Sequence, residues 1–187
     1  MKKLFALILA VVLLPVIAFA DYSAALNMTM TEYIKQYNNV QAALGAPYIA
    51  LEKPTSWTLW NGYHTAWFNA DKDNAVTITL LTKDPSDAQL LTSGLDRVQI
   101  FAKSEKDLIA LISVADRCAN VFATELFGVS FSALRVTNII RSYYENNCKE
   151  KKMTSYQTID DNNEIALSFF FDGSYYYFDI APLEVLQ

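Results

Sequence analysis

The chain has 187 residues, of which 20 are acidic and 15 basic, so its formal net charge at pH 7 is -5. This acidity disfavours nucleic acid and anionic membrane surfaces as partners, because like charges repel. One histidine, His64, and two cysteines are too few for the usual zinc or copper ligand sets. The chain has only five glycines and no glycine-rich loop that could hold a phosphate. From the scarcity of metal ligands and the lack of such a loop, we expect no metal and no cofactor.

The beginning of the chain has the pattern of a cleaved signal peptide. Lys2 and Lys3 precede a long uncharged apolar run, and Ala18-Phe19-Ala20 has the small-x-small pattern that signal peptidase cleaves. A membrane anchor is the alternative, but the run is short for a membrane span and no basic cluster follows it. We expect residues 1–20 to be removed. Residues 21–187 then form one soluble domain, without stable membrane insertion, in a Gram-negative periplasm or secreted.

Elements can be predicted in chain order from capping and turn signals. Thr29 and Glu32 have capping-box spacing, and Gly45 and Pro47 end the first predicted helix. Asn61-Gly62 is a strong hairpin signal between two strands. Five strands are expected in this part of the chain, over residues 48–51, 55–60, 63–68, 75–82 and 95–103.

A second capping pair, Ser104 and Asp107, opens an amphipathic helix that reaches Phe122, and a third helix is expected over residues 132–147. A two-residue turn at Asp172-Gly173 would pair Phe171 with Ser174. Three more strands are expected over residues 154–159, 164–171 and 174–181. The order α-β5-α-α-β3 predicts an α+β fold, a mainly antiparallel sheet built from hairpins and packed against three helices.

A helix, a strand and then a hairpin occur twice along the chain, which allows a diverged α-β-β-β tandem repeat. In the first copy, Met30-Thr31, the helix end Leu44-Gly45-Ala46-Pro47 and tryptophan-rich strands follow one another. This stretch of about 30 residues resembles the small α-β-β-β modules of outer-membrane assembly lipoproteins of the SmpA/OmlA type and of β-lactamase inhibitor proteins. The resemblance implies a similar local architecture and a possible envelope-assembly role, and it transfers no site residue.

The two cysteines of the mature chain, Cys118 and Cys148, are predicted to form a disulfide, which an exported compartment permits. Closing this loop would stabilise the fold by roughly 3 kcal/mol. A simple antiparallel pair of helices would separate the cysteines by about 18 Å, so the bond requires a broken helix or a steep crossing. A nucleophilic cysteine is the alternative, and His64 is the only histidine that could serve it as a base.

Aromatic side chains are the strongest functional signal, because 11 Tyr, 11 Phe and three Trp concentrate on the two hairpins. A sheet covered by helices needs only one apolar face. The surplus aromatic face is therefore either buried by another element or exposed as a recognition surface, since Tyr and Trp anchor interfaces and stack on sugars. The candidate binding residues are Trp60, Tyr63 and Trp67 on the first hairpin and Phe170, Tyr175 and Tyr177 on the last.

The favoured hypothesis is an exported, non-enzymatic binding protein, most concretely an inhibitor or immunity-type protein for an envelope-active enzyme. Cleavage of the signal removes two lysines and changes the net charge to -7, which would steer a cationic protein partner. One alternative is a small carboxylate-dependent hydrolase acting on glycans, with Asp96, Glu164 and Asp179 as candidate carboxylates. Another is an envelope-assembly accessory factor. His64, opposite Leu59 in the first hairpin, is interpreted as a half-buried structural residue.

Overall fold

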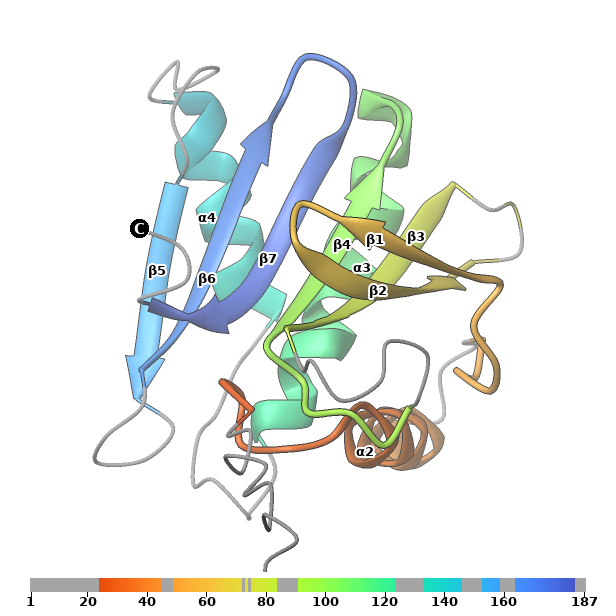
Figure 1. Cartoon of the computed structure of the whole chain (residues 1–187). Coiled ribbons are helices and arrows are strands. Elements are labelled where there is room, and N and C mark those ends of the chain that lie inside the picture. Colours follow the sequence, from red (N-terminus) through yellow and green to blue (C-terminus); the bar gives the residue numbers. More distant parts are fainter. Residues whose placement is uncertain are drawn as a thin grey trace, which may run out of the picture.

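A seven-stranded antiparallel sheet forms the centre of the structure, within the residues that this computed structural model describes. Its strand order is β1-β2-β3-β4-β7-β6-β5 (Figure 1). The described residues are 24–44, 49–71, 73, 75–83, 91–123, 133–145, 153–158 and 164–183. The predicted signal peptide, residues 1–20, lies outside them, and its cleavage stays a prediction.

Two antiparallel meanders make up this sheet, β1 to β4 and β5 to β7, and the pairing of β4 with β7 joins them. The first part of the chain forms α2 (Met30–Leu44), β1 (Ser56–Trp60), β2 (Tyr63–Asn69), β3 (Val76–Thr82) and β4 (Arg97–Ala102). The second forms η1 (Glu105–Asp107), α3 (Leu108–Asn120), η2 (Val121–Ala123), α4 (Ala133–Glu145), β5 (Met153–Thr158), β6 (Glu164–Phe171) and β7 (Tyr176–Pro182). The predicted α+β class is confirmed. Helix α2 is followed by a meander of four strands and helix α4 by a meander of three, and duplication stays a prediction.

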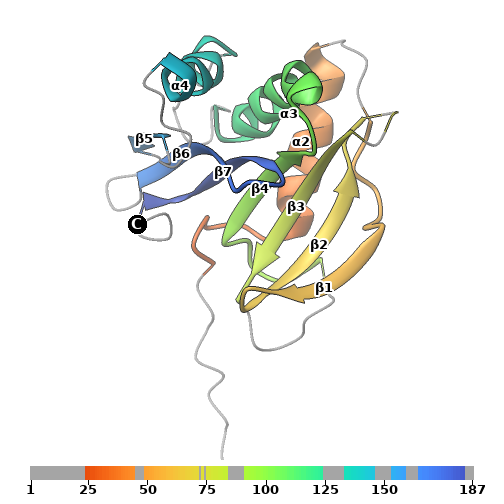
Figure 2. The same ribbon diagram turned by 90° about the horizontal axis from the view of Figure 1, so that it is seen from above.

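All three described α-helices lie on one face of the sheet, as Figure 2 shows. Helix α3 packs against β3, β4 and β7, helix α4 against β5 and β6, and helix α2 against α3. We call this side the covered face and the opposite side the open face. The central cross-strand row of the covered face is buried and apolar, and it consists of Phe68, Ile78, Ile100, Phe178 and Phe169.

Two of the predicted local features form as expected, namely the helix cap at Thr29 and Glu32 and the turn at Asn61-Gly62. At the start of α2, the Glu32 Oε2 atom accepts the Thr29 N–H at 2.7 Å, and the Glu32 N–H donates to Thr29 Oγ1 at 3.2 Å. Between β1 and β2, Asn61 and Gly62 both have positive φ, 50° and 80°, in a two-residue turn. Such turns match the twist of the flanking strands, and they fix the hairpin register.

The predicted strand over residues 48–51 is wrong, because residues 49–52 belong to no strand. Leu51 is buried as its apolar character requires, but the side chain of Asn38 on α2 takes the place of a partner strand. The Leu51 N–H donates to Asn38 Oδ1 at 2.9 Å, and Asn38 Nδ2 donates to the Leu51 carbonyl at 2.8 Å. Four strands, not five, therefore lie between α2 and α3 in the described part of the chain.

The register of the last hairpin differs from the prediction by two residues. Phe171 pairs with Tyr176, not with Ser174, because Asp172 closes a longer loop by accepting the N–H groups of Ser174 and Tyr175. Side chains alternate with a period of two, so a shift of two residues leaves every side chain on its predicted face. Phe170 and Tyr177 therefore still share the open face.

The predicted Cys118–Cys148 disulfide is wrong, because Cys118 carries a free thiol. Cys118 lies on the inward stripe of α3, fully buried in the core between helices and sheet, where it packs as a small apolar residue. Burial raises the pKa of its thiol to about 12. Cys148 lies outside the described residues.

Candidate functional site

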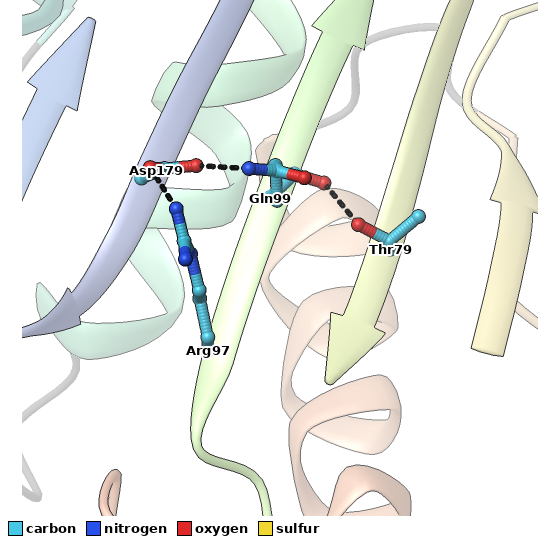
Figure 3. Close-up of polar contacts among 4 residues, drawn as sticks. All are labelled: Thr79, Arg97, Gln99 and Asp179. Carbon is cyan, nitrogen blue, oxygen red and sulfur yellow. Dashed lines mark hydrogen bonds and ion pairs between the residues drawn. The ribbon is translucent and has the colours of Figure 1, made fainter. Parts of the chain in front are cut away.

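A row of buried polar side chains crosses the open face at the centre of the sheet. Thr79 of β3, Gln99 of β4 and Asp179 of β7 are cross-strand neighbours, and each is at most 3% exposed. Gln99 Nε2 donates to Asp179 Oδ1 at 2.7 Å, and Arg97 forms an ion pair with the other oxygen of Asp179 (Figure 3). Thr79 Oγ1 donates to the Gln99 main-chain carbonyl at 3.1 Å. We call these four residues the polar row.

Aromatic rings on the same face form a continuous group beside the polar row. Phe101 of β4 lies at its centre, with ring centroids 5.4 Å from Trp67 and 5.7 Å from both Tyr175 and Tyr177. Tyr177 stacks on Phe170 at 4.9 Å and 12°. These contacts leave Tyr177 only 7% exposed, while Phe170 and Tyr175 are half-buried. The outer aromatics of the last hairpin are thus largely covered by other rings rather than freely exposed. The aromatic cluster consists of Trp60, Trp67, Phe101, Phe170, Tyr175 and Tyr177.

A pocket of about 180 Å³ opens where the two hairpins meet on the open face. Four of the six predicted binding residues line it, Trp60 and Tyr63 from the first hairpin and Phe170 and Tyr177 from the last. Trp67 and Tyr175 do not line it, but both pack within the aromatic cluster. The rest of the pocket wall consists of Asn61, Leu81, Arg97, Gln99 and Asp172.

The charges of Arg97 and Asp179 offset each other in their ion pair. Asp172 is the other charged residue that lines the pocket, and its charge is not offset in this way. Its Oδ1 atom accepts the N–H groups of Ser174 and Tyr175 at 2.7 and 2.8 Å. Burial alone would raise the pKa of Asp172, but the N–H groups of Tyr175 and Ser174 and the Tyr177 hydroxyl together lower it. The carboxylate is therefore ionised at neutral pH and gives the pocket one net negative charge.

Two polar atoms in the pocket wall are buried and have no hydrogen-bond partner among the described residues. They are Arg97 Nε, which carries a hydrogen to donate, and Gln99 Oε1, which can only accept. Buried polar atoms are normally paired, and each one left unpaired costs roughly 1–3 kcal/mol. Both atoms have almost no accessible surface, so they lie behind the lining of the pocket and a group in the pocket does not reach them in this arrangement.

Two of the carboxylates predicted for a hydrolase, Asp96 and Asp179, do not line this pocket. Both oxygens of Asp96 are used structurally, because they accept the N–H groups of Ala25 at 2.9 Å and Lys83 at 2.6 Å. Both oxygens of Asp179 bind within the polar row, and the side chain of Glu164 lies outside what the structure describes. Within the described residues, the pocket wall carries one carboxylate, Asp172, whereas glycoside hydrolysis uses two.

Sequence reasoning missed Phe101 as the centre of the aromatic cluster, and it assigned no role to Arg97, Gln99 or Asp172. The sequence of β4 does contain a signal for these residues. Arg97, Gln99 and Phe101 follow one another at intervals of two, so they share one face of the strand, while the buried Val98 and Ile100 lie on the other face. That pattern places three residues of different chemistry on the second face of a central strand. Such a face is worth inspecting whenever its neighbours are also aromatic.

His64 lies opposite Leu59 on the covered side of the first hairpin and is half-buried, as predicted. Among the residues described, no three His, Cys, Asp or Glu side chains gather closely enough to hold a metal ion. None of the described helices is both long enough and apolar enough to cross a membrane. The pocket on the open face is thus the best-supported candidate site in this part of the chain.

Comparison with known proteins gives no relative from which a function could be inferred, so a functional proposal depends on the pocket. No protein-family model matches the chain, and neither the curated proteins nor the solved structures contain a match.

Proposed function

We propose that this protein is an exported, non-enzymatic binding protein whose pocket on the open face receives a group of its partner. The observation that carries the proposal is the convergence of both aromatic hairpins on one pocket, whose wall also contains Arg97, Gln99 and Asp172. Anchors in well-packed pockets typically dominate the energetics of protein interfaces, and Trp, Tyr and Arg are enriched among them. The pocket wall contains all three residue types.

The most concrete form of the proposal is an inhibitor or immunity-type protein for a cationic, envelope-active enzyme. The net charge of -7 after signal cleavage supports it, since opposite net charges accelerate encounter. Asp172 adds a local negative charge at the pocket itself. Electrostatic steering of this kind weakens as salt rises, so the association rate with the partner should fall with ionic strength.

A pull-down from envelope extract tests the proposal, and β1 offers a matched pair of variants for it. Trp60 lines the pocket, whereas its neighbour Leu59 points to the other side of the strand and is 70% exposed. We expect the wild type and Leu59→Ala to retain the same partner and to inhibit its activity, and Trp60→Ala to retain at least tenfold less.

Recovery of no specific partner would contradict the proposal, as would equal retention by Trp60→Ala and wild type. Retention of an outer-membrane assembly complex, with no enzyme inhibited, would instead favour the envelope-assembly role. Turnover of glycan substrates by the purified protein, lost in Asp172→Asn, would favour a hydrolase.

A further inference from the structure

Strand β1 (Ser56–Trp60) is an edge strand of the sheet, and β2 is its neighbour there (Figure 2). No other described strand pairs with β1, and Ser56, Thr58 and Leu59 are exposed. We infer that this edge pairs antiparallel with β1 of a second copy of the chain, about a twofold axis at Thr58. The inference concerns a surface apart from the pocket and goes beyond the proposed function.

The main-chain groups of β1 point alternately toward β2 and toward the open edge, as in any antiparallel ladder. The Trp67 carbonyl of β2 accepts the Thr55 N–H at 2.7 Å, so the odd-numbered residues of β2 face β1. Their cross-strand partners on β1 are the even-numbered residues Ser56, Thr58 and Trp60. The N–H and carbonyl groups of Trp57 and Leu59 therefore point outward, which gives the edge two donors and two acceptors.

These outward groups are complementary to themselves. With Thr58 opposite Thr58 of the second copy, Trp57 of each copy lies opposite Leu59 of the other, and all four outward groups of both copies are paired. A shift of one residue would set outward-facing groups against inward-facing ones. A shift of two would leave Trp57 or Leu59 without a partner inside the strand. One register thus satisfies the whole edge.

The side chains of β1 agree with the same register. Leu59 is 70% exposed and, with Ile109, is one of two large apolar side chains that are exposed in the described part of the chain. Trp57 lies on the same side of the strand and packs partly against the core. In the inferred dimer, Leu59 of each copy lies beside the Trp57 ring of the other, a favourable cross-strand pair.

The composition of β1 favours a second copy over a charged segment of another protein. Its sequence, Ser-Trp-Thr-Leu-Trp, contains no charged residue and no proline, which are the usual means of protecting an edge strand from pairing. A cationic segment would find no carboxylate on β1 to pair with. A second copy instead brings the matching apolar residues and the matching main-chain groups.

The dimer should be weak, and salt should strengthen it. Two strands of five residues bury less than the roughly 1,200–2,000 Å² of a standard stable interface, so we expect a dissociation constant of about 100 μM. The net charge of -7 on each mature copy opposes association, and salt screens this repulsion. Capture of a cationic partner should weaken with salt, so the two associations respond in opposite directions.

Cross-linking of the exported protein tests the register, in a Cys148→Ser background that leaves only the buried Cys118 thiol. Thr58→Cys would place two thiols on the axis, at a Cα–Cα distance of about 4.5 Å, within the range of a disulfide. Ser56→Cys is the matched control, because it lies about 13 Å from its own copy in this register. We expect Thr58→Cys to form a disulfide-linked dimer at least tenfold faster. Equal rates would overturn the inference.

Sedimentation velocity from about 10 to 500 μM tests the association itself, without a cross-link. Wild type and Ile109→Ala should shift from monomer to dimer, and more so at high salt. Leu59→Pro removes one outward N–H but none that faces β2, and an edge strand tolerates it, so a folded Leu59→Pro should stay monomeric. A wild type that stays monomeric, a mass that grows beyond the dimer, or an unchanged dimer in Leu59→Pro would each overturn the inference. If wild type is monomeric and still captures its partner, this inference fails and the proposed function stands.

Discussion

The covered and open faces of the sheet both bury most of their central rows, but with different chemistry. The covered row is entirely apolar, from Phe68 through Phe178 to Phe169, and helices α3 and α4 pack against the strands that carry it. One residue further along each strand, the open row runs from Trp67 through Thr79, Gln99 and Asp179 to Ser168. Its four polar members are at most 3% exposed.

This difference indicates a division of roles between the two faces. Apolar burial is non-directional and is the dominant stabilising contribution to a fold. A buried ion pair with hydrogen bonds adds little net stability, but it requires a specific geometry, which suits it to holding a recognition site in place. The covered face should therefore determine the stability of the protein, and the open face its selectivity.

The largest expected effect is on the rate at which the Cys118 thiol is labelled. This rate measures how well the covered face excludes solvent and reagent. Because burial raises the pKa of its thiol to about 12, the reactive thiolate is almost absent at pH 8. We expect the folded protein to react with a maleimide at Cys118 roughly 2,000-fold more slowly than in 6 M guanidinium, the ratio of thiolate fractions for a pKa of about 12 and the ordinary thiol pKa of about 8.5. Rapid labelling, or a Cys118–Cys148 cross-link found by non-reducing mass spectrometry, would contradict a closed covered face.

Phe178→Ala and Phe170→Ala compare the two faces within one hairpin. Phe178 is fully buried in the helix-covered core, so its truncation should lower the free energy of unfolding by about 4 kcal/mol. Phe170 is half-buried on the open face, and its truncation should cost about 1–2 kcal/mol, because less apolar area returns to water. Urea unfolding of both variants measures this. Equal losses would remove the distinction between the faces.

Asp179→Ala should destabilise the protein by about 2 kcal/mol, because it leaves the half-buried Arg97, whose side chain is 17% exposed, without its partner. The double variant Arg97→Met/Asp179→Leu should recover most of that loss, since apolar residues can replace a buried ion pair at little net cost. Thermal melting of the three proteins decides the matter. If the double variant is less stable than Asp179→Ala, the polar row stabilises the fold itself and the division between faces fails.

The smallest effect concerns pH and the loop at the pocket. The pKa of Asp172 is lowered in the folded protein, so its stabilising contribution is complete above the unfolded pKa of about 4 and is lost as pH falls through the folded value. Wild type should therefore lose more stability than Asp172→Asn between neutral pH and pH 2. Parallel urea curves at several pH values measure the difference. Identical pH profiles would mean that the loop does not hold the charged carboxylate.

Most elements could be predicted because the groups that decide them are close in the chain. The Thr29–Glu32 cap and the Asn61-Gly62 turn each depend on neighbouring residues, and both form as expected. The predicted strand over residues 48–51 is wrong because the group that decides its conformation is distant in the chain. Its only described backbone partner at Leu51 is the side chain of Asn38, thirteen positions earlier on a helix, which no local pattern indicates.

The site was only half predictable from sequence. Alternation placed each set of aromatic residues on one face of its own hairpin, and a two-residue register error left that unchanged. That both sets share one face of one sheet depends on the pairing of β4 with β7, in which Phe101 lies opposite Tyr177. This contact joins strands more than seventy positions apart, so neither hairpin carries a signal for it, and Phe101 was missed.

Hydrogen exchange of the protein with its captured partner tests most directly whether recognition belongs to the open face. Exposed apolar side chains also exist on the other side, namely Leu59 at 70% and Ile109 on α3 at 81%. We predict that the bound partner protects the β1–β2 turn at Asn61 and Gly62 and the β6–β7 loop at Asp172 to Tyr175, and leaves the exchange of α3 around Ile109 unchanged. Protection of α3 with no change in those two loops would contradict a recognition site on the open face.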